Sequence, residues 1–322
     1  MSRRGTAAIL SSAFGLALLL TLSGTRLASS QVATITVFRT GGAVPAREPW
    51  NAFWDKVPLI DIPLSAQQTT PPMGGHRWTM RAGAIHDAGN LYIVTEWADP
   101  AADRSVGAQQ DFTDAVAVQF PAVAGTTVPA LCMGDPSATV NIWQWRAAWQ
   151  ADIHRGYQGG VRTTHPDTVS DLYPFHDEDV FHPGRHAGNP FSLLQRSSPV
   201  DNLVAAGFGT LTSDPLPAVS GWGQWRDGAW RVVFSRPLVV GREGNVDLTV
   251  PGVTDVAFAV WDGGAGERDG MKSVAAFVRL DLDRTPLGEE PPSSAWTILG
   301  LLLALAASFV AVAASKRRRA RA

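Results

Sequence analysis

Lysine is rare in this chain, and that rarity draws attention to one position. The chain has 27 lysine and arginine residues, but only Lys56, Lys272 and Lys316 are lysines. Lys272 directly follows the glycine-rich stretch of WDGGAGERDGMKSV, residues 261–274. Arginine stays protonated in proteins, whereas lysine can lose its proton and offer a nitrogen lone pair to a metal. Lys272 is therefore a candidate metal ligand.

A neutral lysine has an energetic cost that its surroundings must offset. From a reference pKa near 10.4, removing the proton at pH 7 costs roughly 4–5 kcal/mol. Burial against an apolar cofactor and a metal–nitrogen bond can offset that cost. The alternative interpretation of Lys272 is a surface lysine at the start of a strand, which the lysine count alone does not exclude.

A second ligand could come from methionine, whose soft thioether sulfur binds haem iron. After the initiator the chain has four methionines: Met73, Met80, Met133 and Met271. Met133 ends an apolar run in LCMGDPSATVNIWQW and precedes Gly134, where the backbone can approach a flat ring. The alternative is that Met133 fills the core, the commoner role of a methionine.

Other motifs for chemistry are weak. The chain has no Gly-x-Ser-x-Gly, no His-Glu-x-x-His and no phosphate-binding glycine loop. Cys132 is the only cysteine, so neither an internal disulfide nor a Cys-x-x-Cys-His haem attachment can form. A His-rich loop over 165–186 could bind a metal or a partner, but its spacing matches no tight metal pattern and a solvated loop is the favoured interpretation. Its acidic and histidine residues are His165, Asp167, His176, Asp177, Glu178, Asp179, His182 and His186.

Strands must position these candidate ligands. Seven runs are rich in Val, Ile, Phe and Trp, and most alternate with period two between Gly, Pro or Asp. They span 32–38, 91–97, 114–120, 139–145, 230–236, 256–261 and 274–282. So many strands in one domain predict a mainly β fold, a jelly-roll-like β-sandwich with long loops.

The twelve tryptophans offer two interpretations. Exposed indoles on a sandwich could stack on sugar rings, which would make the domain a carbohydrate-binding module. Five of the tryptophans sit in strand-like runs, where packing in the core is the commoner role. These five are Trp143, Trp145, Trp225, Trp230 and Trp261.

The two ends of the chain differ from the rest. Residues 1–30 have a basic start, an apolar run and small residues near their end, which predicts a secretory signal peptide. Residues 296–314 carry no charge and are long enough for one transmembrane helix. The basic tail 315–322 then predicts a cytoplasmic C-terminus, with a domain over 31–285 and a linker over 286–295 on the exterior side of the cell membrane.

Charge limits the partners of the exterior domain. Residues 31–315 contain 19 basic and 29 acidic residues, a net charge of about −10. Binding to nucleic acid requires cations that neutralise phosphates. We therefore expect no nucleic-acid partner.

Six runs, in order, resemble one family. They are TEWADP (95–100), DFTDAVAVQFP (111–121), MGDPSATVNIWQWRA (133–147), AAGFGTLT (205–212), GQWRDGAWRVVFSRPL (223–238) and VAFAVWDGGAGERDGMKSV (256–274). The chain resembles the haem b γ-subunits of respiratory molybdenum enzymes. That group contains ethylbenzene dehydrogenase, dimethylsulfide dehydrogenase, selenate and chlorate reductases and related nitrate reductases.

The resemblance implies a cofactor and its ligands. In that family a methionine and a lysine bind the iron of one non-covalent haem b from opposite faces, within a β-sandwich. The methionine of the MGD motif corresponds to Met133, and the lysine after the WDG loop corresponds to Lys272. Met271 should point to the opposite face of its strand and is not expected to be a ligand.

The resemblance also implies a function. The expected role is electron transfer between an iron–sulfur β-subunit, next to a molybdenum catalytic α-subunit, and a quinone-linked or soluble cytochrome carrier. The chain would not itself be the catalyst, and its C-terminal membrane helix distinguishes it from soluble members. The alternative is an exterior, non-redox β-sandwich module that binds carbohydrate or protein.

Overall fold

The computed structural model describes residues 33–76, 79–125, 128–131, 133–155, 184, 187–193, 196–216 and 218–289. The predicted signal peptide, transmembrane segment 296–314 and basic tail 315–322 lie outside these residues, as do the four histidines of the 165–186 loop. Within the described part of the chain, no helix has the length and apolar character needed to cross a membrane.

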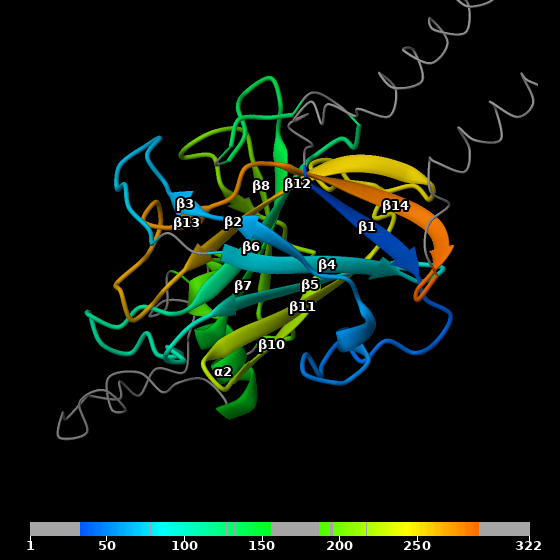
Figure 1. Ribbon diagram of the computed structural model, residues 1–322. Helices are drawn as coiled ribbons and strands as arrows, with labels where there is room; N and C mark the ends of the chain where they lie inside the picture. The colour runs from blue at the N-terminus through cyan, green and yellow to red at the C-terminus, as the bar shows by residue number, and fades with distance from the viewer. Residues whose placement is uncertain are drawn as a thin grey trace, which may run out of the picture. The chain divides into compact units, whose positions relative to one another are not determined.

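Almost all regular structure belongs to one folded-over sheet (Figure 1). The strands follow the order β10 (Ser220–Arg226), β11 (Ala229–Pro237), β5 (Asn90–Ala98), β4 (Thr79–His86), β1 (Thr34–Arg39), β14 (Val278–Pro286), β12 (Gly252–Trp261), β6 (Ala115–Pro121), β7 (Val140–Arg146), β8 (Val200–Ala205) and β9 (Thr212–Ser213). Off this path, β2 (Ile60–Pro63) pairs with β4, and β13 (Ser273–Val274) pairs with β12 and β3 (Ser65–Ala66). The described helices are η1 (Trp54–Lys56), α2 (Ala147–Arg155) and η2 (Pro190–Ser192).

Strand β12 is shared between two halves of the sheet. Its first part, Gly252 to Val256, pairs with β14, whereas Ala257 to Trp261 pairs with β6. We call β10-β11-β5-β4-β1-β14 half A, and β6-β7-β8-β9 with the end of β12 half B. Pairing is antiparallel throughout, except that β1 runs parallel to both of its neighbours.

The two halves pack face to face around an aromatic core. Trp145 of half B lies 5.0 Å from Trp230 and 6.5 Å from Trp97 of half A, between ring centroids. Trp143 of half B lies 6.5 Å from Phe234 of half A. These rings are all 0–1% exposed and belong to one buried cluster. The predicted mainly β, sandwich-like fold is therefore confirmed.

Six of the seven predicted strands are confirmed within a few residues, but the seventh is wrong. The run 274–282 forms two strands, β13 and β14, rather than one. Val274 pairs with Ala259 in half B, whereas Val278 pairs with Val256 in half A. The chain crosses from one half of the sandwich to the other between these residues, so a continuous strand cannot form.

Helix α2 was not predicted, because its two turns have no clear apolar stripe. Tertiary contacts hold it instead. Gln150 accepts hydrogen bonds from the indole N–H of Trp145 (2.9 Å) and from the backbone N–H of Gly223 (2.7 Å), and its amide donates to the Gly223 carbonyl (2.6 Å). This buried glutamine therefore fixes α2 against β7 and β10.

The outer face of half A is closed by the segment 44–59. Trp54 is 1% exposed and packs in a cluster with residues of β1, β4, β5 and β11. A Cβ on Gly83 of β4 would lie 2.4 Å from the carbonyl oxygen of Pro58 and 2.8 Å from the Leu59 side chain. The covering segment therefore lies directly on the sheet. The strand residues of this cluster are Phe38, Ile85, Tyr92, Val94 and Val233.

Candidate cofactor-binding site

On β6 and β12, the outer face of half B is built mainly from alanines. Along β6 and β12 the large residues face the central core, because neighbouring side chains point to opposite faces. The core-facing residues are Val116, Val118, Phe120, Phe258 and Val260. The outward-facing residues are Ala115, Ala117, Ala257, Ala259 and Trp261. Four alanines leave room over the sheet that a second covering segment would otherwise occupy.

A cavity of about 440 Å³ lies over this outer face. Its volume is within the range of cofactor and ligand pockets, roughly 300–1,000 Å³. Both predicted ligands, Met133 and Lys272, line it. The apolar part of the wall includes Phe112, Ala115, Ile142, Trp149, Phe191, Leu203, Phe208 and Trp261. The fold thus brings together two candidate ligands that are far apart in the sequence.

A second, much smaller cavity of about 30 Å³ adjoins the same residues. It shares Ile142, Trp261 and Lys272 with the large cavity. Its other lining residues include Gln119 and Leu131, together with the alanines Ala117, Ala257 and Ala259. Lys272 therefore borders open space on the alanine side as well as on the side of the large cavity.

The backbone of Met133 has an uncommon conformation, with φ 87° in the left-handed region that favours glycine. Two hydrogen bonds hold it there: its N–H donates to Oε1 of Gln119 (3.1 Å), and its carbonyl accepts from the N–H of Gly207 (2.8 Å). Strain of this kind persists only where surrounding contacts compensate, and it is common at functional sites. Gln119 and Gly207 therefore position Met133.

The glycine after Met133 is needed for close approach. Gly134 has φ 69°, and a Cβ there would lie 2.6 Å from the Ala138 carbonyl oxygen. The Met133 side chain is half-buried and packs on the outer cluster of half B. The tight turn at Gly134 thus keeps the methionine against the sheet.

Lys272 is buried, with 8% of its surface exposed. Its Nζ lies 5.1 Å from the ring centroid of Trp261, at the end of β12. Its backbone N–H donates to the Gly74 carbonyl (3.2 Å), and its carbonyl accepts from the N–H of Gln67 (3.0 Å). A Cβ on Gly75 would lie 2.1 Å from the Lys272 carbonyl oxygen, so glycine is required where the two segments meet.

The loop before Lys272 is held at several points. The Trp261 indole N–H donates to the Asp269 carbonyl (3.1 Å), and the Gln67 amide donates to the Gly270 carbonyl (2.9 Å). Glu267 is 2% exposed and accepts from the backbone N–H groups of His76 (2.9 Å) and Asp262 (3.0 Å). The glycine-rich loop is therefore an ordered support for Lys272.

Met271 lies outside the wall of the cavity. Its side chain is 3.7 Å from the Cβ position of Gly74, and its sulfur is 3.7 Å from a guanidinium nitrogen of Arg268. Its neighbours Gly270 and Lys272 both line the cavity.

A partly buried arginine, with 13% of its side chain exposed, stands in the wall of the large cavity. The Arg146 guanidinium lies 4.5 Å from the ring centroid of Trp149 and 4.6 Å from that of Phe191. Nη2 donates to Gln144 (2.6 Å), whereas Nη1 is buried without a hydrogen-bond partner and lies 3.7 Å from Asp201. Burial lowers the pKa of Arg146 to about 10, so it stays charged at neutral pH.

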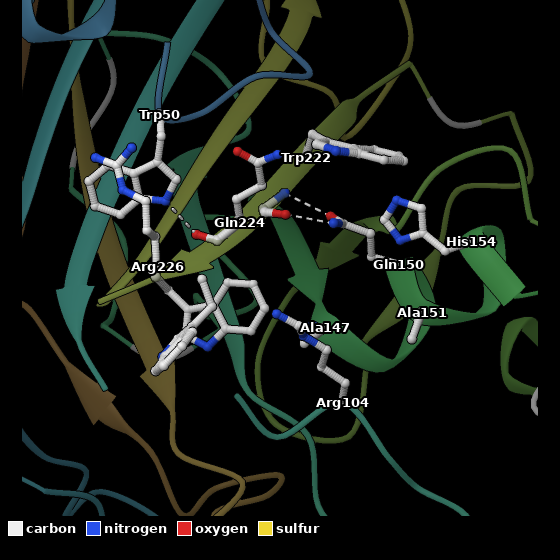
Figure 2. A pocket seen from close by; sticks show the side chains of 12 residues that line it. Trp50, Arg104, Ala147, Gln150, Ala151, His154, Trp222, Gln224 and Arg226 are labelled. Atoms are coloured by element: carbon white, nitrogen blue, oxygen red, sulfur yellow. Dashed lines mark hydrogen bonds between the residues drawn. The ribbon is translucent and has the colours of Figure 1, made fainter. Parts of the chain in front are cut away.

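Another cavity, of about 430 Å³, lies on the other side of α2. Ala147, Gln150, Ala151 and His154 face it, whereas Ala148 and Trp149 face the Met133–Lys272 cavity. Figure 2 shows His154 beside Trp222 and Arg226 beside Trp50 on its walls. Helix α2 is thus a wall between the two cavities.

In the 430 Å³ cavity beside α2, arginine side chains partly cover the faces of the indole rings. Guanidinium groups lie over the Trp50 ring at 4.3 Å (Arg226) and 4.0 Å (Arg231) from the centroid. Arg47 lies 5.3 Å from the centroid of Trp222. Stacking of a sugar on these rings would therefore have to displace arginine side chains.

Sequence reasoning missed the alanines and Arg146. The alanines leave a signal in the runs DAVAVQF and VAFAVW, where alanine alternates with larger apolar residues. Such a pattern indicates one face that is packed and one that needs space. Arg146 gave no comparable signal, because its burial depends on α2 and on Phe191.

Residues 51–273 match the ethylbenzene dehydrogenase family. The chain belongs to this family. The predicted resemblance to haem b γ-subunits is thereby confirmed, and the match spans both Met133 and Lys272.

Three relatives of this chain, a member of the ethylbenzene dehydrogenase family, have names that state their roles. A protein of Haloferax mediterranei named as a respiratory nitrate reductase haem subunit is 28% identical over 259 residues, 80% of this chain and 76% of the relative. The chlorate reductase γ-subunit of Ideonella dechloratans is 29% identical over 232 residues, 71% of this chain and 76% of the relative. The dimethylsulfide dehydrogenase γ-subunit of Rhodovulum sulfidophilum is 24% identical over 258 residues, 74% of this chain and 77% of the relative.

Among solved structures, a carbohydrate-binding module of family 9 from Caldicellulosiruptor kristjanssonii in complex with cellotriose is similar to this chain. The identity is 10% and the TM-score is 0.39, over 81% of this chain and 98% of the module.

Proposed function

We propose that this chain is the haem b electron-transfer subunit of a molybdenum and iron–sulfur oxidoreductase, and that Met133 and Lys272 are the axial ligands of one haem iron. The observation that carries the proposal is that both residues line one largely apolar cavity on the outer face of half B. The haem and γ-subunit names of the relatives support the same role.

The residues of the cavity fit a haem. Bound haem supplies one-electron chemistry at its iron, and the protein sets the potential through ligand type and burial. Lys272 provides an amine nitrogen in a buried setting beside Trp261. Ala115 and the apolar wall leave space for a flat macrocycle and exclude water from it.

The guanidinium of Arg146 can donate a hydrogen bond to a carboxylate group of the haem. Its Nη1 is buried in a wall of the cavity and makes no hydrogen bond, although it lies 3.7 Å from Asp201, and the guanidinium packs on Trp149 and Phe191. A charged hydrogen bond between arginine and a carboxylate is about twice as strong as a neutral one. We infer that Arg146 holds a haem propionate.

The partners follow from this role. In the proposed complex the chain relays electrons between an iron–sulfur β-subunit, next to a molybdenum α-subunit, and a quinone-linked or soluble cytochrome carrier. The predicted segment 296–314 tethers it to the cell membrane, with the haem domain on the exterior side. Catalysis then belongs to the molybdenum subunit, and this chain transfers electrons.

Substituting Lys272 with arginine tests the ligand pair. Lys272→Arg retains the positive charge but removes the nitrogen lone pair, so we expect loss of the six-coordinate, low-spin haem spectrum. Lys56→Arg is the matched control, because Lys56 is exposed at η1 and should leave the spectrum unchanged. Absorbance and electron paramagnetic resonance of the haem-loaded protein are the measurements.

Two results would contradict the proposal. A Lys272→Arg protein with an unaltered haem spectrum excludes Lys272 as a ligand. A folded wild-type protein that takes up no haem when haem is supplied excludes the electron-transfer role altogether.

The second candidate function is the non-redox binding module, favoured only by the tryptophan-lined cavity beside α2 (Figure 2). Its test is a titration with cellulose oligosaccharides, followed by tryptophan fluorescence. We expect no saturable change, because arginines cover the Trp50 and Trp222 rings. Saturable quenching that Trp222→Ala abolishes, in a protein that binds no haem, would favour the module instead.

A further inference from the structure

Three aspartates from distant parts of the chain meet at the loop that leads to Lys272. Asp99 follows β5, Asp114 precedes β6, and Asp262 follows β12. Each offers one carboxylate oxygen, and these three oxygens lie within 4.8 Å of one another. The three residues belong to the motifs TEWADP, DFTDAVAVQFP and VAFAVWDGG, and the proposed haem ligation uses none of them.

The cluster has polar atoms without partners. Asp99 is 1% exposed and its Oδ2 has no hydrogen-bond partner. The neighbouring Asp103 likewise has a buried Oδ2 without a partner. Among the described residues, no lysine, arginine or histidine forms an ion pair with any of these four aspartates, which are Asp99, Asp103, Asp114 and Asp262.

Buried carboxylates that are close together need a compensating charge. Removing one ionised carboxylate from water costs several kcal/mol, and neighbouring negative charges add to this cost. Three buried or partly buried carboxylates this close together therefore need either shared protons or a bound cation.

The spacing of the oxygens fits a cation of calcium's size. Calcium–oxygen bonds are about 2.3–2.6 Å long, so ligands on opposite sides of the ion lie up to roughly 5 Å apart. Three oxygens within 4.8 Å of one another can bind one such ion. Magnesium usually keeps several of its waters and is rarely held by protein ligands alone, so a buried set of carboxylates favours calcium.

Hydrogen bonds already hold the aspartates in place. Asp114 accepts from the N–H of Gly263 (2.9 Å), the N–H of Asp103 (2.7 Å) and the indole N–H of Trp230 (2.9 Å). A Cβ on Gly263 would lie 2.2 Å from the Phe112 carbonyl oxygen, so the loop passes close to the segment that carries Asp114. The ligand set is thus preorganised around one point.

We propose that Asp99, Asp114 and Asp262 bind one divalent cation of calcium's size. The cation connects the end of β5 and the start of β6 to the first residue of the loop 262–271, which carries Lys272 at its far end. This site is separate from the proposed haem ligands and does not depend on them.

Terbium luminescence tests the site directly. Terbium replaces calcium at oxygen sites, and Trp230, hydrogen-bonded to Asp114, is adjacent to transfer excitation energy. In full-length protein treated with a chelator, we expect saturable terbium emission that added calcium competes away. Asp262→Asn should weaken terbium binding by roughly tenfold or more, because ligand charge sets affinity at such sites.

Two matched variants control for other acidic groups. Asp227→Asn replaces an exposed aspartate that is 92% accessible, and should leave terbium emission unchanged. A double Asp177→Asn and Asp179→Asn variant removes charge from the His-rich stretch of the sequence, and should also leave the emission unchanged.

A thermal measurement on the wild-type protein keeps the test decisive if the aspartate variants do not fold. Calcium should raise the melting temperature, as expected for a ligand that binds only the folded state. The proposal is overturned if calcium neither shifts the melting temperature nor competes with terbium. It is overturned equally if Asp99→Asn and Asp262→Asn bind terbium with wild-type affinity, or if magnesium competes and calcium does not.

Discussion

The two outer faces of the sandwich have opposite designs. On half A, the segment 44–59 lies on the sheet, and Trp54 is buried among large strand residues. On half B, alanines such as Ala115 and Ala259 replace the large residues, and a cavity takes the place of a covering segment. The same strand alternation thus produces a face closed by the chain itself and a face that carries a cavity, where we propose that the haem binds.

The difference separates stability from ligand binding. Half A gains the free energy of a buried tryptophan from its own sequence, which requires no other component. Half B leaves apolar surface, Lys272 and the strained Met133 for an added molecule to cover. We therefore expect substitutions on the two faces to have different effects.

The largest effect is expected on half A. Trp54→Ala should lower the free energy of unfolding by about 3–5 kcal/mol, because it empties a packed site. The haem spectrum of the protein that remains folded should not change, since Trp54 does not line the cavity. Urea denaturation and haem absorbance are the measurements. A lost low-spin spectrum in folded Trp54→Ala protein would show that the two faces are coupled.

A smaller loss of stability is expected from Gln119→Leu on half B. It removes the acceptor of the Met133 N–H and leaves a strained donor without a partner, at a cost of about 1–3 kcal/mol. Unlike Trp54→Ala, it should also shift the reduction potential, because the methionine loses its support. Spectroelectrochemistry measures the shift, with the exposed Gln224→Leu as control. An unchanged potential would contradict the positioning role of Gln119.

Filling the open face should affect binding more than folding. Ala115→Leu places a larger side chain in the wall of the cavity, and we expect haem affinity to fall by roughly tenfold, about 1.4 kcal/mol. Haem titration followed by absorbance measures it, beside the exposed Ala52→Leu as control. Equal affinities for Ala115→Leu and wild type would place the haem elsewhere.

The smallest effect concerns pH on the closed face. Burial, with a hydrogen bond to Asp87, raises the pKa of Tyr92 to about 12. Between about pH 10 and pH 12 the unfolded tyrosine ionises while the folded one keeps its proton. The folded state then binds more protons, so stability falls as pH rises through this window.

Urea denaturation at several alkaline pH values measures this decline, and ultraviolet difference spectra follow the ionisation. Tyr92→Phe should show a flatter decline between pH 10 and pH 12. The same slope in both proteins would contradict the assignment.

The sequence predicted elements whose signal is local. Runs such as DAVAVQF and WRVVFSR alternate strongly, and they form β6 and β11 as expected. The break between Val274 and Val278 was not predictable, because it depends on which half of the sheet each residue pairs with. Helix α2 was not predictable for a similar reason, because Gln150 stabilises it through contacts with the distant residues Trp145 and Gly223.

The candidate site likewise has residues that the sequence alone indicates and residues that only the fold brings together. Lys272 stood out because lysine is rare, and the resemblance selected Met133, so neither required a three-dimensional structure. The cluster of Asp99, Asp114 and Asp262 could not be predicted, because each aspartate alone is an ordinary turn residue and only the fold brings them together.

The shared strand β12 has a consequence for the order of events when the protein is made. Lys272 comes only after β12 in the chain, near the end of the strands, whereas Met133 precedes β7. Contacts between such distant segments form slowly, because loop closure must come first. If Met133 and Lys272 bind the haem as proposed, both ligands are in place only when nearly the whole domain has been synthesised and its two halves are joined. Under this proposal, haem uptake reports completed folding, and a chain that ends before Lys272 lacks one of the two proposed ligands.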